Sequence, residues 1–120
     1  MNLQTFKRLA ERIERYEAEM VQMQIDLCSY PALSPDNGGD GEHEKALYLQ
    51  KSLQRLGLTG IETLPAPDPR VSSGLRPNIL VRLPGRQPGR TLWILTHMDV
   101  VPPGEPSLWQ SDPYRAEVRD

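Results

Sequence analysis

The sequence predicts an α/β fold in which two helices are followed by about three strands of a mixed sheet. Two amphipathic stretches come first, over residues 3–28 and 42–56, and three short strand-like stretches follow, over residues 60–64, 78–83 and 91–96. Helical periodicity followed by apolar runs between Gly and Pro residues is typical of a fold that layers helices on a sheet. The 120 residues allow one domain at most.

Residues 3–28 show the clearest helical pattern in the chain. Apolar side chains recur along one face at steps of three and four residues: Leu3, Phe6, Leu9, Ala10, Ile13, Tyr16, Met20, Met23 and Leu27. The same stripe fits a short heptad pattern, so a coiled-coil arm is an alternative. Because Tyr and Met are poor seam residues, we expect this helix to pack onto its own domain.

Residues 31–42 are rich in Gly, Pro and Asp, which predicts a linker. A calcium loop is disfavoured because the acidic residues lack EF-hand spacing. The helix predicted over residues 42–56 places Ala46, Leu49, Leu53 and Leu56 on one face, and Gly57 is expected to cap it. His43 falls on the polar side of its first turn and is expected to be exposed.

The strongest strand candidate is residues 91–96. Its continuous apolar run predicts a central strand buried on both faces. The candidates at 60–64 and 78–83 are shorter or weaker. The turn-rich link over residues 84–89 would make the last two strands antiparallel neighbours.

Composition excludes several classes of function. The net charge is -2 and no basic patch is present, so nucleic acid is not an expected partner. No apolar run is long enough to span a membrane, and the N-terminus does not look like a signal peptide, which predicts a cytoplasmic protein with no membrane partner. The arginines after position 69 are expected to be solubilising loop charges: Arg70, Arg76, Arg82, Arg86 and Arg90.

Chemistry-bearing residues follow the strongest strand directly. His97 and Asp99 are two residues apart, so in an extended chain their side chains point the same way. A neutral imidazole is a zinc ligand, and a carboxylate on its other nitrogen would orient it. On the dipeptide alone, a histidine satisfied at a strand end is the more common interpretation. A different enzyme, in which His97 acts as an acid or base on a doubly wound sheet, is a further alternative.

A longer pattern around His97 favours the metal-ligand interpretation, because the pattern resembles the N-terminal part of the M20 metallopeptidases. This group includes aminoacylase, acetylornithine deacetylase, succinyl-diaminopimelate desuccinylase and glutamate carboxypeptidase. The matching pieces are His97-Met-Asp99-Val-Val-Pro102, Gly104, Trp109 and Asp112-Pro113-Tyr114, with weaker ones at Cys28 to Ser34, Leu49 to Leu58 and Arg76-Pro-Asn78.

The resemblance implies a two-zinc hydrolase that cleaves an amide bond in an N-acyl amino acid or short peptide. By the match, His97 is a metal ligand and Asp99 is the catalytic carboxylate that orients it. Co²⁺ or Mn²⁺ could replace Zn²⁺ at such ligands. Water bridging two metals would be activated for attack on the scissile carbonyl.

In the family's order, the remaining ligands, the general base and a separate lid and dimerisation domain all lie beyond residue 120. We therefore expect residues 1–120 to be the N-terminal portion of an incomplete zinc-peptidase-like catalytic domain, inactive alone. A homodimer would form through the domain that is absent here. The alternative function is a non-catalytic interaction module that uses the N-terminal amphipathic helix.

Overall fold

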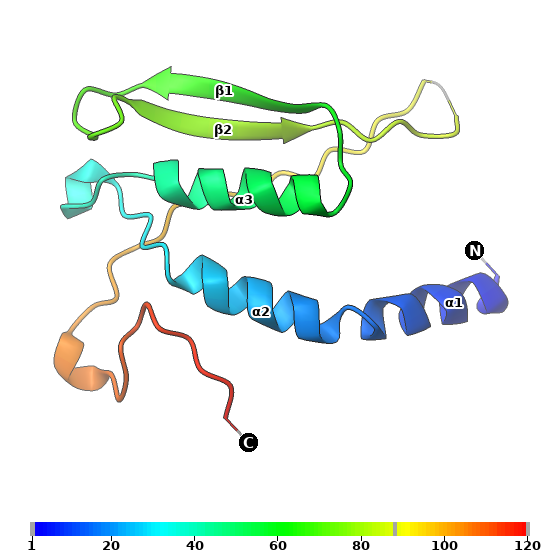
Figure 1. Cartoon of the computed structure of the whole chain (residues 1–120), viewed down its shortest axis with the longest axis horizontal. Coiled ribbons are helices and arrows are strands. Elements are labelled where there is room, and N and C mark those ends of the chain that lie inside the picture. The colour runs from blue at the N-terminus through cyan, green and yellow to red at the C-terminus, as the bar shows by residue number, and fades with distance from the viewer. Residues whose placement is uncertain (1, 88, 120) are drawn as a thin grey trace. The chain divides into compact units, whose positions relative to one another are not determined.

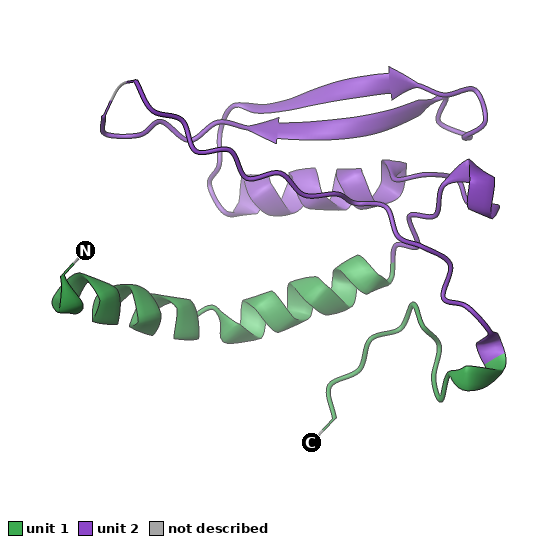
Figure 2. Cartoon of the chain, turned by 180° about the vertical axis from the view of Figure 1, so that it is seen from behind, with its two compact units in different colours: residues 1–29, 107–120 green, residues 30–106 purple. Residues whose placement is uncertain are grey.

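The computed structural model of the chain describes residues 2–87 and 89–119. The chain divides into two units. Unit 1 is Met1–Ser29 with Ser107–Asp120, and unit 2 is Tyr30–Pro106 (Figure 2). Pro88, which belongs to the predicted link between two strands, lies outside the described residues.

Unit 1 carries two successive helices, α1 (Leu3–Glu14) and α2 (Glu17–Cys28) (Figure 1). The periodicity predicts one helix over residues 3–28, so the break at Arg15 and Tyr16 is a correction. There the N–H of Tyr16 bonds to a carbonyl three residues back rather than four, which tightens the turn. Neither residue is Gly or Pro, so the break leaves no signature in the sequence.

The apolar face of α1 is open to solvent. Its large side chains are 48–70% exposed: Leu3, Phe6, Leu9 and Ile13. No described residue of α1 or α2 is buried. Unit 1 by itself therefore does not provide the packing that the sequence predicts for this face. None of the described helices is long and apolar enough to cross a membrane.

Residues 31–42, called the acidic loop from here on, are folded onto themselves. Pro35–Asn37 forms a short 3₁₀ helix. The N–H of Gly39 bonds to the carbonyl of Ser34 at 3.0 Å, and the N–H of Gly41 bonds to that of Leu33 at 2.9 Å. The predicted connection between two helices is therefore present as a loop, and the loop satisfies part of its own backbone in this way.

Helix α3 (His43–Arg55) forms where the sequence predicts it. Gly57 takes a left-handed conformation with φ 78°, which favours Gly. Its N–H bonds to the carbonyl of Gln54 at 2.9 Å, while the N–H of Leu58 reaches the carbonyl of Leu53 at 3.1 Å. This pair of bonds is a Schellman motif, so the predicted C-terminal cap is confirmed.

The sheet of unit 2 is an antiparallel hairpin of β1 (Ile61–Pro67) and β2 (Leu75–Val81), with Ile61 opposite Val81. The connecting turn is closed by a bond from the N–H of Asp68 to the carbonyl of Gly74 at 3.0 Å. Helix α3 packs along β2 (Figure 1). The strands predicted at 60–64 and 78–83 are thus present with shifted bounds.

The strand predicted over residues 91–96 does not form. Four of its side chains are 71–94% exposed: Leu92, Trp93, Ile94 and Leu95. The expected antiparallel pairing of this segment with residues 78–83 is also wrong, because the sheet in the described residues holds β1 and β2 and no third strand. A strand needs a neighbour for its backbone N–H and C=O groups, and the described residues provide none beside this run. Among the described residues, the pairing nearest to it is an isolated parallel bridge between Leu33 and Val100.

Three small side chains make up the buried apolar core among the described residues: Ala32, Ala46 and Val71. They come from the acidic loop, from α3 and from the hairpin turn. The close approach of the acidic loop to the hairpin turn is visible at Gly41, where an added Cβ would lie 3.1 Å from a methyl group of Val71. Because the apolar core is so small, polar contacts hold much of unit 2 together.

Candidate metal centre

The imidazole of His97 is held by the carboxylate two residues later. The Nδ1 atom lies 3.0 Å from Oδ1 of Asp99 and 3.0 Å from the Asp99 backbone carbonyl. Both partners accept, so Nδ1 carries the proton in the neutral ring. The His97 side chain is 81% exposed, and no hydrogen bond to its Nε2 is present among the described residues. The structure thus brings the two predicted site residues together, with one ring nitrogen turned to solvent.

The chain just after Asp99 is fixed to the acidic loop by backbone contacts. The N–H of Val100 bonds to the carbonyl of Ala32 at 3.0 Å. The next residue of the loop, Leu33, forms the parallel bridge with Val100. His97 itself emerges from an exposed extended segment rather than from a buried strand, so its support comes from residues that follow it.

The acidic loop is in turn clamped to the hairpin by three polar contacts. Asp36 accepts from Arg70 at 2.8 Å, and Asp40 accepts from the backbone N–H of Ser72 at 2.6 Å. The third contact is the forked pair of Arg76 with Glu42, in which Nε donates to one carboxylate oxygen at 2.9 Å and a terminal nitrogen donates to the other. The Glu42 side chain is only 7% exposed, so this pair is the best shielded of the three.

These contacts change the acidity of the groups involved. A hydrogen bond from the Arg70 guanidinium lowers the pKa of Asp68 to about 2. Hydrogen bonds from the Ser72 hydroxyl and backbone lower the pKa of Asp40. The pKa of Arg76 is raised, first by its hydrogen bond to Glu42, with a smaller contribution from the charge of Asp99.

Two of the arginines, Arg70 and Arg76, differ from their prediction. Both were expected to be isolated solubilising charges, and both form ion pairs across unit 2. The signal that could have found one of them was present, because Arg76 opens the Arg-Pro-Asn piece of the family resemblance. Nothing comparable marks Arg70.

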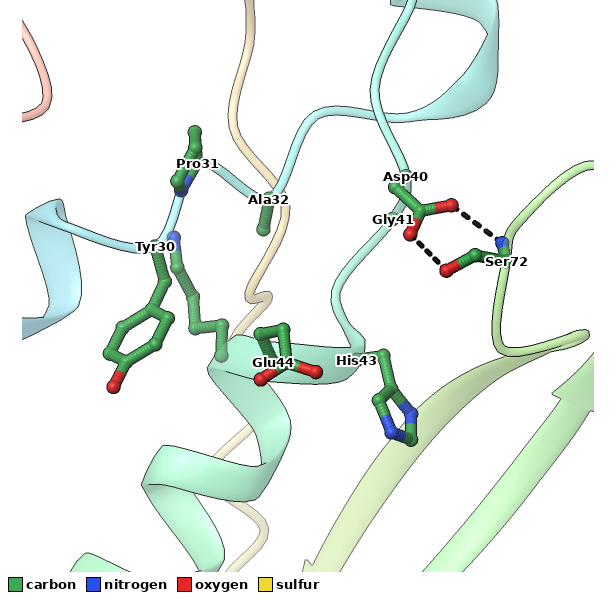
Figure 3. Close-up of a pocket in the computed structure, with 9 residues that line it drawn as sticks. Tyr30, Pro31, Ala32, Asp40, Gly41, His43, Glu44 and Ser72 are labelled. Atoms are coloured by element: carbon green, nitrogen blue, oxygen red, sulfur yellow. Dashed lines mark hydrogen bonds between the residues drawn. The ribbon is translucent and has the colours of Figure 1, made fainter.

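A pocket of about 260 Å³ lies beside the acidic loop, at the start of α3 (Figure 3). His43, Glu44 and Asp40 line it, and Asp40 is engaged by Ser72 there. His43 is half-buried, not exposed as expected. Within residues 2–87 and 89–119, no three or more His, Cys, Asp or Glu side chains are grouped so that they could hold a metal.

The last residues of the extended motif, Trp109 and Asp112 to Tyr114, belong to unit 1. Asp112 forms a local turn, in which its side chain accepts from the N–H of Tyr114 at 2.9 Å and its carbonyl accepts from the N–H of Arg115 at 3.0 Å. Such side-chain-to-backbone turns are typical of Asp. The roles predicted for His97 and Asp99 therefore rest on the local geometry of unit 2 alone.

In the comparison with known proteins, the chain matches metallohydrolases and desuccinylases. The chain is 36% identical over 112 residues to an uncharacterized metallohydrolase of Methanococcus maripaludis, a match that covers 85% of the chain and 25% of that protein. A second uncharacterized metallohydrolase, from Methanocaldococcus jannaschii, is 35% identical over 107 residues, covering 85% of the chain and 26% of that protein. A succinyl-diaminopimelate desuccinylase of a Ruegeria species is 28% identical over 108 residues, covering 88% of the chain and 24% of that protein.

The chain thus spans about a quarter of the length of these relatives. No protein-family model matches it, and no solved structure does. The resemblance read from the sequence is confirmed by the relatives. Over most of its length, the chain is homologous to metallohydrolases and succinyl-diaminopimelate desuccinylases of the M20 family.

Proposed function

We propose that this chain forms part of a metal-dependent hydrolase that cleaves an amide bond in an N-acyl amino acid or a short peptide. Two observations support the proposal. The chain is homologous to metallohydrolases and to desuccinylases. It also carries a histidine whose Nδ1 is held by a carboxylate at 3.0 Å.

The pairing of His97 with Asp99 is the observation that carries the proposal. A metal-binding histidine commonly donates its second ring N–H to a carboxylate, which fixes the tautomer and strengthens the ligand. Here Asp99 occupies that place and keeps the proton on Nδ1. The lone pair of Nε2 is then available on the side of the ring that faces solvent.

His97 can provide one ligand of a metal site, and the described residues do not provide the other ligands beside it. A catalytic zinc takes three protein ligands and one open position, and the described residues hold no such group. When bound, zinc would polarise the scissile carbonyl and activate water. His97 would bind and Asp99 would orient it, with Co²⁺ or Mn²⁺ as other metals for these donors. We therefore expect the 120-residue chain alone to be inactive.

Metal binding at His97 can be tested inside one sample, because the chain has only two histidines. Zn²⁺ is titrated into the chain while the ring ¹⁵N signals of His97 and His43 are followed by NMR. We expect the Nε2 signal of His97 to respond first, with His43 as the internal control. Asp99→Asn should weaken the response of His97 by about tenfold. An equal response of the two rings would contradict the proposal.

Activity gives a separate test. The 120-residue chain should release no product from N-succinyl or N-acetyl amino acids, with or without Zn²⁺. A longer protein that contains this chain should hydrolyse one of them, and His97→Ala should abolish the activity while the protein stays folded. Zinc-dependent turnover by the 120-residue chain would contradict the assignment of His97 as one ligand of a larger site.

A further inference from the structure

The peptide group between Asp99 and Val100 is hydrogen-bonded at both ends. Its carbonyl oxygen lies 3.0 Å from Nδ1 of His97, and its N–H donates to the carbonyl of Ala32 at 3.0 Å. A peptide group is planar, and the described residues contain no cis peptide bond, so these two groups point in opposite directions. Any turn of the N–H away from Ala32 therefore also turns the carbonyl that holds the imidazole.

The hydrogen bonds at His97 are themselves open to water. The side chains of His97 and Asp99 are 81% and 50% exposed, and the apolar residues that precede His97 are exposed and give it no packing. An exposed hydrogen bond between residues two positions apart competes with bonds to water, so it contributes little by itself. A carbonyl that is held in place from elsewhere makes the bonded orientation of the ring more favourable.

Ala32 belongs to a well-held part of the acidic loop. The residue is only 2% exposed. The carbonyl of Leu33, the next residue, accepts from the N–H of Gly41 at 2.9 Å, and a Cβ added to Gly39 would overlap Leu33. Leu33 also forms the parallel bridge with Val100. The acidic loop thus presents the Ala32 carbonyl at a fixed place.

We propose that Ala32 is a positioning residue for the candidate metal ligand. Its carbonyl fixes the Asp99–Val100 peptide group, and through that group it keeps the proton of the His97 ring on Nδ1. The lone pair of Nε2 is then ready for a metal before any metal arrives. The inference rests on the proposed function where the metal is concerned, whereas the tautomer of the ring is a property of the metal-free chain.

Val100→Pro tests this link, because it removes the N–H that bonds to Ala32. The tautomer of His97 is measured by ring ¹⁵N NMR on the metal-free 120-residue chain, at an alkaline pH where the imidazole is neutral. We expect the proton mainly on Nδ1 in the unsubstituted chain and a mixture of the two tautomers in the variant. In a second titration, the Kd of Zn²⁺ at His97 should rise about tenfold in the variant.

Two matched variants show whether the N–H itself matters. Val100→Ala keeps the N–H and removes most of the side chain, so the tautomer should not change. Val101→Pro makes the same substitution one residue later, where the N–H has no hydrogen bond within the described part of the chain. It should also leave the tautomer unchanged, and circular dichroism should show that all three variants keep their helices.

Gly39→Ala reaches the same link from a distance and serves as the test if Val100→Pro does not fold. The added Cβ displaces Leu33 beside Ala32, so the mixture of tautomers should appear here too, and not in Gly85→Ala. A ring that stays protonated on Nδ1 in the folded variants would overturn the proposal, as would an unsubstituted chain protonated mainly on Nε2. A proton held on Nδ1 as predicted, together with no response of His97 to Zn²⁺, would support the positioning and overturn the proposed function instead.

Discussion

The acidic loop and the apolar segment over residues 91–96 behave in opposite ways to what their compositions suggest. The acidic loop, rich in Gly, Pro and Asp, is folded and joined to the hairpin by ion pairs. The apolar segment, which reads as a central strand, is extended and exposed. Polar contacts can form between the few segments of a small unit, whereas a strand buried on both faces needs neighbouring strands and covering layers.

This difference decides how the candidate site is supported. His97 follows the apolar segment, which gives it no packing. The residue after Asp99 is tied to the acidic loop through the carbonyl of Ala32, and Glu42 of the same loop holds Arg76 on β2. In the described residues, the support for the His97–Asp99 pair thus comes from polar structure and not from the predicted strand.

The largest effect that tests this comparison is expected from Glu42→Ala. It leaves Arg76 without its forked partner at a site where the Glu42 side chain is 7% exposed. Loss of such charge-assisted hydrogen bonds should lower the free energy of unfolding by about 2 kcal/mol, measured by urea denaturation. Glu44→Ala, an exposed residue two positions later in α3, is the matched control. Equal effects would show that the acidic loop does not clamp unit 2.

A somewhat smaller effect is expected from Gly39→Ala. An added Cβ at this position would overlap the carbonyl and Cβ of Leu33, so the acidic loop must shift. The cost should be about 1.5 kcal/mol of unfolding free energy. Gly85→Ala is the control, because its nearest atom would be 3.9 Å away and the change should be neutral or slightly stabilising. A neutral Gly39→Ala would mean that the loop is not packed as described.

The pH dependence of stability gives the next prediction. The pKa of Asp68 is lowered to about 2 by its bond from Arg70. Because the folded pKa lies below the ordinary value of 3.8, the stabilisation is complete above about pH 4 and is lost as pH falls toward 2. Unfolding curves at a series of pH values should show this loss, and Asp68→Asn should flatten it. An unchanged slope in Asp68→Asn would exclude this ion pair as the cause.

The smallest effect is expected in the apolar segment. Ile94 is 85% exposed, so Ile94→Asp should change the free energy of unfolding by less than about 0.5 kcal/mol, as exposed substitutions do. The same variant should be more soluble, because it interrupts an uncharged run of high strand propensity. Burial on both faces would instead make Ile94→Asp severely destabilising. That outcome would restore the strand predicted from the sequence.

The sequence by itself determined the features that depend on near neighbours. Helix α3 and its Gly57 cap follow from periodicity and from the conformational freedom of Gly. The pairing of His97 with Asp99 spans two residues and was visible in their spacing. The homology to M20 metallohydrolases was also readable in the motif that begins there.

Only the tertiary structure decided the contacts between residues far apart in the chain. Glu42 and Arg76, like Asp36 and Arg70, are separated by 34 residues, and no local pattern marks either pair. The exposure of residues 91–96 also depends on the tertiary structure. Their apolar pattern specifies burial, but burial needs partners at the strand edges and faces, and the described residues do not supply them. Local chemistry can be read from neighbouring residues, while burial and ion pairing depend on what the rest of the fold brings alongside.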